Sequence, residues 1–148
     1  MKNVLIVEAQ FYPGIAKALR DGAAAVLKSS GARFEYLGVP GALEIPQAIA
    51  IAARASEKSG RIFDGYVALG CVIRGMTYHF EIVAQQSAAG LMKLSLQHGL
   101  CIGNGILTCE SEQQALARSA PEGANKGGSA ARACLALIET RARLEGSA

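Results

Sequence analysis

The sequence predicts an α/β fold in which helices cover both faces of a four-stranded parallel sheet. Short apolar segments alternate with longer ones in which apolar residues recur at helical spacing, and no linker or repeat interrupts them. The segment Val67–Ile73 is almost wholly apolar, as a strand buried on both faces should be. At this length, residues 1–148 should form a single domain.

The first half of the chain is predicted to supply two strands and two helices. Val4–Val7 is an apolar strand, and Pro13 suits the first position of the next helix, where its missing N–H is not needed. Ser29–Gly31 ends that helix, and Phe34–Leu37 predicts the second strand. The turn Val-Pro-Gly-Ala-Leu-Glu-Ile-Pro and the helix after it occupy about residues 39–58.

The second half supplies the third strand, described above, and a fourth strand with three helices. The helix after the third strand should end at His98–Gly99, a pair typical of helix C-termini. Cys101–Leu107 predicts the fourth strand, and Ser111 with Gln114 matches a capping box that opens a short helix. The last helix is predicted for Asn125–Leu144.

Composition and charge narrow the classes of function. The chain is 51% hydrophobic and 18% charged, so we expect part of its apolar surface to face another subunit. No apolar stretch is long enough to span a bilayer and no signal peptide opens the chain, which predicts a cytoplasmic protein with no membrane partner. The net charge of +3 is spread along the chain, which argues against nucleic acid as a partner.

Motifs for common cofactors and metals are absent from the sequence. The four cysteines, Cys71, Cys101, Cys109 and Cys134, form no CxxC pair, which favours buried thiols over a metal site or disulfides. No GxGxxG follows a strand, and the Asn-Lys-Gly-Gly segment at 125–128 lacks the preceding glycine of a P-loop. We therefore expect no metal, ATP or NAD.

The carboxyl ends of parallel strands meet at one edge of a sheet, and open α/β sheets bind ligands there. Arg74–His79 follows the third strand and is predicted to form the first turn of a helix, whose free N–H groups suit an anion. Segments at the ends of the other strands should reach the same edge: Glu8–Phe11 after the first strand, Gly41–Glu44 after the second, and Asn104–Glu110 near the end of the fourth. The sequence therefore predicts one binding site built from four segments.

Two side chains at this edge, and Arg118 on the short helix, could contribute chemistry, and each also has a structural alternative. His79 is of a residue type that suits proton transfer, or it could cap the helix and pack on Phe80. His98, in a last helical turn, is interpreted as structural. Glu44 could accept hydrogen bonds from ring N–H groups of a ligand, or serve as an acid at a helix start. Arg118 could bind phosphate, or lie solvated on the surface.

The motifs that carry a family resemblance are collinear over nearly the whole chain. They are Phe11, the Val-Pro-Gly-Ala-Leu-Glu-Ile-Pro turn at 39–46, Ala-Leu-Gly-Cys-Val-Ile-Arg-Gly-Met-Thr-Tyr-His-Phe-Glu at 68–81, Gly-Ile-Leu-Thr at 105–108, Gln114–Arg118 and Asn-Lys-Gly at 125–127. Together they resemble the 6,7-dimethyl-8-ribityllumazine synthase family. The resemblance implies a flavodoxin-like αβα sandwich that assembles as pentamers with active sites between neighbouring subunits.

The resemblance also implies a reaction and a set of residue roles. The transferase would condense 5-amino-6-(D-ribitylamino)uracil with 3,4-dihydroxy-2-butanone 4-phosphate, giving 6,7-dimethyl-8-ribityllumazine, phosphate and water in riboflavin biosynthesis, without a cofactor. His79 would transfer protons. The pyrimidine and its ribityl chain would meet Phe11, Ala42, Leu43, Glu44, Cys71, Val72, Ile73 and Lys126, and the phosphate would meet Met76, Thr77 and the adjacent subunit's copy of Arg118. Riboflavin synthase would act downstream.

Two features depart from the family pattern. Asn104 stands where many members carry an aromatic residue that covers the pyrimidine from the neighbouring subunit, so a polar contact would replace stacking there. The chain also begins at its first core strand, without the N-terminal extension of shell-forming members, although Ser119–Asn125 keeps the length found in them. We therefore expect a free pentamer, or a decamer of two pentamers, in preference to a closed shell.

Two rival functions fit part of the pattern. A flavin- or lumazine-binding carrier on the same fold would use Phe11 and Glu44 equally well, but it needs neither His79 nor a phosphate clamp. A sugar-phosphate isomerase or lyase would use His79 on a single substrate, and would leave Phe11 and Glu44 without a heteroaromatic ring to hold.

Overall fold

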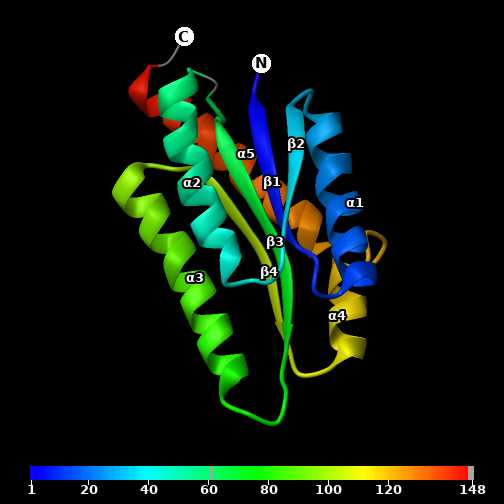
Figure 1. Cartoon of the computed structure of the whole chain (residues 1–148). Coiled ribbons are helices and arrows are strands. Elements are labelled where there is room, and N and C mark those ends of the chain that lie inside the picture. Colours follow the sequence, from blue (N-terminus) through cyan, green and yellow to red (C-terminus); the bar gives the residue numbers. More distant parts are fainter. Residues whose placement is uncertain (61, 147–148) are drawn as a thin grey trace.

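The computed structural model describes residues 1–60 and 62–146 (Figure 1), so residues 61, 147 and 148 of the predicted domain lie outside the described residues. The strands are β1 (Asn3–Ala9), β2 (Arg33–Val39), β3 (Gly65–Ile73) and β4 (Ile102–Cys109). The helices are α1 (Pro13–Ser29), α2 (Glu44–Ser59), α3 (His79–His98), α4 (Glu112–Ser119) and α5 (Lys126–Glu145).

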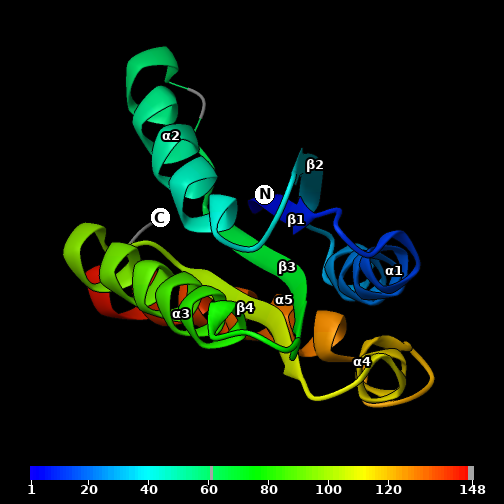
Figure 2. The ribbon, with the colours of Figure 1, turned by 60° about the horizontal axis from the view of Figure 1, so that its bottom comes forward.

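All four strands are parallel and form one sheet in the order β2-β1-β3-β4, with helices on both faces. This flavodoxin-like arrangement confirms the predicted fold class. The helices α2 and α3 lie on one side of the sheet, and α1, α4 and α5 lie on the other (Figure 2). No helix within the described ranges is long and apolar enough to cross a membrane.

The core has two parts because side chains of the central strands alternate between the two faces of the sheet. On β1, Val4 and Ile6 pack among residues of α1 and α5, while Leu5 and Val7 pack on the α2 and α3 side. These four side chains are at most 5% exposed. Burial on both faces explains the nearly continuous apolar runs from which the strands were predicted.

The helix after β3 begins later than predicted. We expected Arg74–His79 to form its first turn, but α3 begins at His79 and residues 74–78 form a loop. The N-cap residue Tyr78 makes no side-chain capping bond. The Arg74 guanidinium instead bonds to Glu81 and to Glu110, which keeps residue 74 beside the strand ends and outside the helix.

The fourth strand ends two residues later than predicted. We expected a strand at Cys101–Leu107, but β4 spans Ile102–Cys109 because its pairing with β3 extends through the Ile73–Cys109 pair. Asn104 lies inside this edge strand, as the predicted bounds imply, and pairs with Ala68 of β3. Its side chain is exposed, and its Oδ1 accepts a hydrogen bond from the Ile106 N–H at 2.9 Å.

The helix ends largely follow the predicted signals. Pro13 is the first residue of α1, and Gly99 follows α3 with a φ of 62°. Ser111 caps α4 by accepting a bond from the Gln114 N–H at 3.2 Å. The reciprocal bond of a capping box is not formed, because the Gln114 side chain accepts instead from the Glu110 N–H at 2.8 Å.

Glycine allows α5 to lie unusually close to the sheet. A Cβ atom at Gly103 in β4 would overlap the carbonyl oxygen of Ala130 in α5. A Cβ at Gly127, at the start of α5, would overlap the carbonyl oxygen of Leu19 in α1. These two glycines therefore set how closely α5 approaches β4 and α1, and α5 carries Lys126 on the same turn as Gly127.

We predict that Gly103→Ala lowers the free energy of unfolding by about 1 to 3 kcal/mol, the usual cost of overpacking a core. Gly14→Ala is the matched control, because a Cβ there meets no atom within 4 Å. It should leave stability unchanged or raise it slightly, since alanine favours a helix. Urea unfolding at matched protein concentration measures both, and a Gly103→Ala variant as stable as the unmodified chain would contradict the close-packing argument.

Candidate active site

A cavity of about 470 Å³ opens where β1, β2 and β3 end. Three chain segments that are far apart in the sequence line it, together with the start of α3. Among its lining residues are Phe11, Ala42, Leu43, Glu44, Cys71, Val72, Ile73, Thr77 and His79, all of which the sequence predicted for one site. Because the strands are parallel, these separate segments converge at one edge of the sheet.

One wall of the cavity is aromatic. The Phe11 side chain follows β1 and is 70% exposed, so its ring is available to a ligand. The Tyr12 ring meets it edge-on, with centroids 4.9 Å apart and planes at 75°. Burial raises the pKa of the Tyr12 phenol, as do the nearby Cys71 and Glu112. A flat ring could therefore stack on Phe11 while Tyr12 supports it from the side.

The second wall is the turn that leads into α2. Ala42 is buried, and Glu44 is the first residue of the helix, where an acidic side chain is favoured by the helix dipole. Its N–H donates to the Gly41 carbonyl at 3.2 Å. A Cβ at position 41 would lie 3.2 Å from Glu44 Oε1, so glycine leaves this carboxylate room beside the cavity.

The third part of the lining is the end of β3. Burial, with a further contribution from the neighbouring Cys109, raises the pKa of the Cys71 thiol to about 12. Cys71 is thus a neutral thiol near pH 7 and a poor nucleophile. All four cysteines are free thiols, of which Cys101, Cys109 and Cys134 are buried as predicted and Cys71 is half-buried. The chemistry of this wall therefore depends on its backbone groups and apolar side chains.

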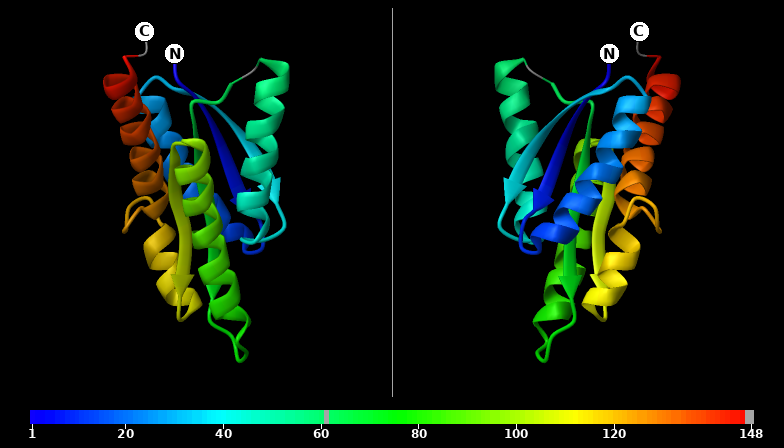
Figure 3. Two further views of the ribbon diagram at one scale, coloured as in Figure 1. Left: turned by 90° about the vertical axis from the view of Figure 1, so that its left-hand side faces the viewer. Right: turned by 90° about the vertical axis from the view of Figure 1, so that its right-hand side faces the viewer.

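The loop from Arg74 to Tyr78 protrudes beyond the ends of β1 and β2 (Figure 3). The Thr77 hydroxyl accepts a hydrogen bond from the His79 N–H at 3.4 Å. Among the described residues, no partner is found for the N–H groups of Gly75 and Met76. The Met76 side chain is fully exposed, and Met76 is not among the residues that line the cavity, whereas its neighbours Gly75 and Thr77 are.

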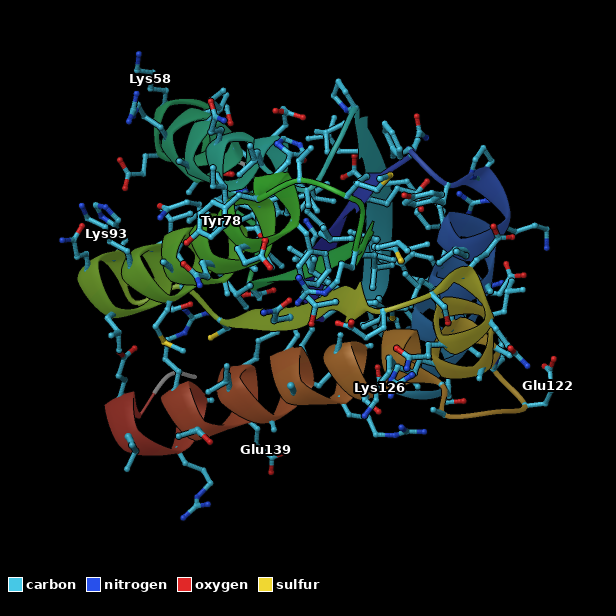
Figure 4. The ribbon with its side chains drawn as sticks, turned by 90° about the horizontal axis from the view of Figure 1, so that it is seen from below. Lys58, Tyr78, Lys93, Glu122, Lys126 and Glu139 are labelled. Atoms are coloured by element: carbon cyan, nitrogen blue, oxygen red, sulfur yellow. The ribbon has the colours of Figure 1, made fainter. Side chains whose placement is uncertain are left out.

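Three predicted site residues lie elsewhere. Asn104, Arg118 and Lys126 line a separate cavity of about 360 Å³ beside β4 and α5. Figure 4 shows Tyr78, at the start of α3, and Lys126, at the start of α5, on opposite sides of the sheet. One protomer thus divides the predicted site between two cavities.

The sequence interpretation did not assign Tyr12, Phe80 and Val83 to the site, although all three line the larger cavity. Tyr12 could have been identified, because it follows Phe11 directly in a strand-end loop. Phe80 and Val83 belong to the face of α3 that packs on the core, and that face also reaches the cavity. A residue on a core-facing stripe gives no sequence signal that it also touches a ligand.

Comparison with known proteins identifies the family. The family model for 6,7-dimethyl-8-ribityllumazine synthase matches residues 1–142. The 6,7-dimethyl-8-ribityllumazine synthase of Bartonella henselae is 56% identical over 142 residues, covering 95% of this chain and 89% of the relative. The 6,7-dimethyl-8-ribityllumazine synthase 1 of Rhodopseudomonas palustris is 53% identical, covering 96% and 87%. The Agrobacterium fabrum 6,7-dimethyl-8-ribityllumazine synthase is 51% identical, covering 97% of both chains.

Proposed function

The chain belongs to the 6,7-dimethyl-8-ribityllumazine synthase family, and on this premise we propose how its residues perform the family's reaction. It is a transferase of riboflavin biosynthesis that condenses 5-amino-6-(D-ribitylamino)uracil with 3,4-dihydroxy-2-butanone 4-phosphate. The products are 6,7-dimethyl-8-ribityllumazine, phosphate and water. One observation carries the proposal for the site: a single cavity joins an exposed aromatic ring to a loop with unpaired N–H donors.

The pyrimidine occupies the part of the cavity between Phe11 and the end of β3. Its ring stacks on Phe11, and its polar edge meets backbone groups of Cys71–Ile73. The ribityl chain follows the Ala42–Glu44 turn, where the Glu44 carboxylate can accept hydroxyl hydrogen bonds. The exposure of the Phe11 ring and the space that Gly41 leaves beside Glu44 support this orientation.

The phosphate of the second substrate binds the loop before α3. Backbone N–H groups at Met76 and Thr77, with the Thr77 hydroxyl, point to an anion site strengthened by the N-terminus of a 20-residue helix. Arg118 of the partner subunit completes the clamp with a charge-assisted hydrogen bond. Lys126 and Asn104 of the partner subunit approach the same site from the second cavity.

The reaction needs few catalytic groups because both substrates are already reactive. The 5-amino group attacks the ketone carbon and water leaves, forming an imine. A proton is then removed from the adjacent carbon and phosphate is eliminated, after which the ribitylamino nitrogen closes the ring with loss of a second water. Orientation of the two substrates contributes most, and His79 carries protons between these steps.

The site is completed only by a neighbouring chain, so we propose an assembly of pentamers, either free or paired as a decamer. The separation of Arg118, Lys126 and Asn104 from the His79 cavity supports this assembly. In a closed ring, each protomer can place its His79 cavity against one neighbour and its Arg118 cavity against the other. We also propose that riboflavin synthase acts downstream on the lumazine product. The cytoplasmic location stays a prediction.

We predict that His79→Ala lowers kcat by about ten- to a hundredfold, at the lower end of general acid–base effects because the substrates are reactive. Absorbance of the lumazine formed from the two substrates measures it. His98→Ala is the control, since His98 ends α3 and lines a different cavity, and it should keep the normal rate. An unchanged kcat in His79→Ala would rule out the proton shuttle, and a wild-type chain that forms no lumazine would refute the proposed function.

For Arg118→Ala we expect the KM of the butanone phosphate to rise by at least about tenfold, because a charge-assisted hydrogen bond contributes roughly 1.5 to 3 kcal/mol. The KM of the pyrimidine should change little. Arg143→Ala, which removes an exposed arginine from the far end of α5, is the matched control and should change neither constant. Equal increases for both substrates would indicate that Arg118 supports the fold or the interface.

A further inference from the structure

Arg74 follows β3 directly and its side chain joins two other elements. Its Nε lies 3.0 and 2.9 Å from the two carboxylate oxygens of Glu110, which follows β4. Its Nη1 donates to Glu81 in the first turn of α3. The guanidinium carbon lies 4.4 Å from the centroid of the Phe80 ring, a cation–π distance. One side chain therefore contacts the start of α3 and the β4–α4 connection.

These contacts favour the charged forms of Arg74 and Glu81. Hydrogen bonds to Glu110 and Glu81 raise the pKa of Arg74, and the bond from Arg74 lowers the pKa of Glu81. The Arg74 N–H also donates to the Cys109 carbonyl at 2.9 Å, so its backbone continues the β3–β4 pairing. The Arg74 guanidinium therefore faces two carboxylates within the protomer, and its positive charge is already balanced there.

The ion pair between Arg74 and Glu81 spans the base of the protruding loop. Between these two residues lie Gly75–Tyr78, which are exposed, and His79, which begins the helix. The N-cap residue Tyr78 supplies no side-chain capping bond to fix the helix start. Few backbone hydrogen bonds hold the segment 75–79 in place, so the contacts of the Arg74 side chain are an important restraint on it.

We propose that Arg74 is a positioning residue for the family's reaction: through Glu81 and Glu110 it holds the base of the loop so that His79 and the Met76 and Thr77 N–H groups meet the substrates. This inference rests on the proposed function of the site. Arg74 also neutralises two carboxylates beside the phosphate site, which would otherwise repel an anionic substrate. Its contact with Phe80 fixes one side of the cavity at the same time.

Arg74→Met tests the inference, because methionine keeps an unbranched apolar stem and removes every charged contact. We expect kcat to fall by about ten- to a hundredfold, the size of loss that a misplacement of about 1 Å can cause. The KM of the butanone phosphate should rise severalfold, while that of the pyrimidine stays within about twofold because Phe11 and the 42–44 turn are untouched. Arg74→Lys keeps the positive charge but cannot bond to both Glu81 and Glu110 as the guanidinium does. It should therefore restore the KM of the butanone phosphate more fully than it restores kcat.

A double-mutant cycle with Glu110→Gln shows whether Arg74 acts through its carboxylate. If it does, Glu110→Gln should cause part of the same loss, and the double variant should be no worse than Arg74→Met alone. Additive losses in the double variant, or a wild-type kcat and phosphate KM in Arg74→Met, would overturn the inference. The rate of lumazine formation by the wild-type chain is measured alongside. If the wild type forms lumazine but these outcomes are found, the inference about Arg74 fails while the proposed function stands.

Controls exclude a general loss of structure. Lys17→Met removes an exposed ion pair with Asp21, in which the side chains lie 2.7 Å apart, and should leave both KM values and kcat unchanged. Unfolding of Arg74→Met should resemble that of the wild type, since exposed ion pairs contribute little stability. Should Arg74→Met fail to fold, Glu81→Gln and Glu110→Gln test the same contacts, and wild-type kinetics in both would overturn the inference.

Discussion

Parallel pairing of the four strands is the constraint on which the rest of the molecule depends. β1 and β3 are buried on both faces, so helices must cover both sides and every crossover must return to the opposite end of the sheet. Each strand therefore delivers its following loop to the same edge. The residues at Phe11, Glu44 and His79 are far apart in the sequence, and this pairing alone brings them to one cavity.

The same constraint explains how much could be predicted from the sequence. The apolar runs identify the strands, and the segments after them contain six of the predicted residues in the larger cavity. The other three, Cys71–Ile73, lie within β3 and were predicted only through the family resemblance. Long-range contacts decide what the local pattern could not. Pairing with β3 extends β4 two residues beyond its predicted end, to Cys109. The bonds from Arg74 to Glu110, 36 residues away, hold residue 74 outside α3, which starts only at His79.

The division of the site between two cavities has a further physical cause. The helix α5 packs on the face of the sheet opposite α3, where Gly103 and Gly127 allow its close approach. Lys126 and the start of α3 therefore lie on opposite sides of the sheet within one protomer. Sequence order places Arg118 and Lys126 after the last strand, but it does not tell which cavity they reach. A complete site of the proposed kind therefore requires that the His79 cavity of one chain meets the Arg118 cavity of its partner.

Co-production of His79→Ala and Arg118→Ala chains in the same cells tests this requirement most directly. If each site combines His79 from one chain with Arg118 from the next, random mixing in equal amounts restores about a quarter of the sites to wild-type composition. Lumazine formation at a low concentration of the butanone phosphate should then exceed that of either variant alone and approach about a quarter of the wild-type rate. A mixed assembly no more active than the average of the two separate variants would contradict a site shared between protomers.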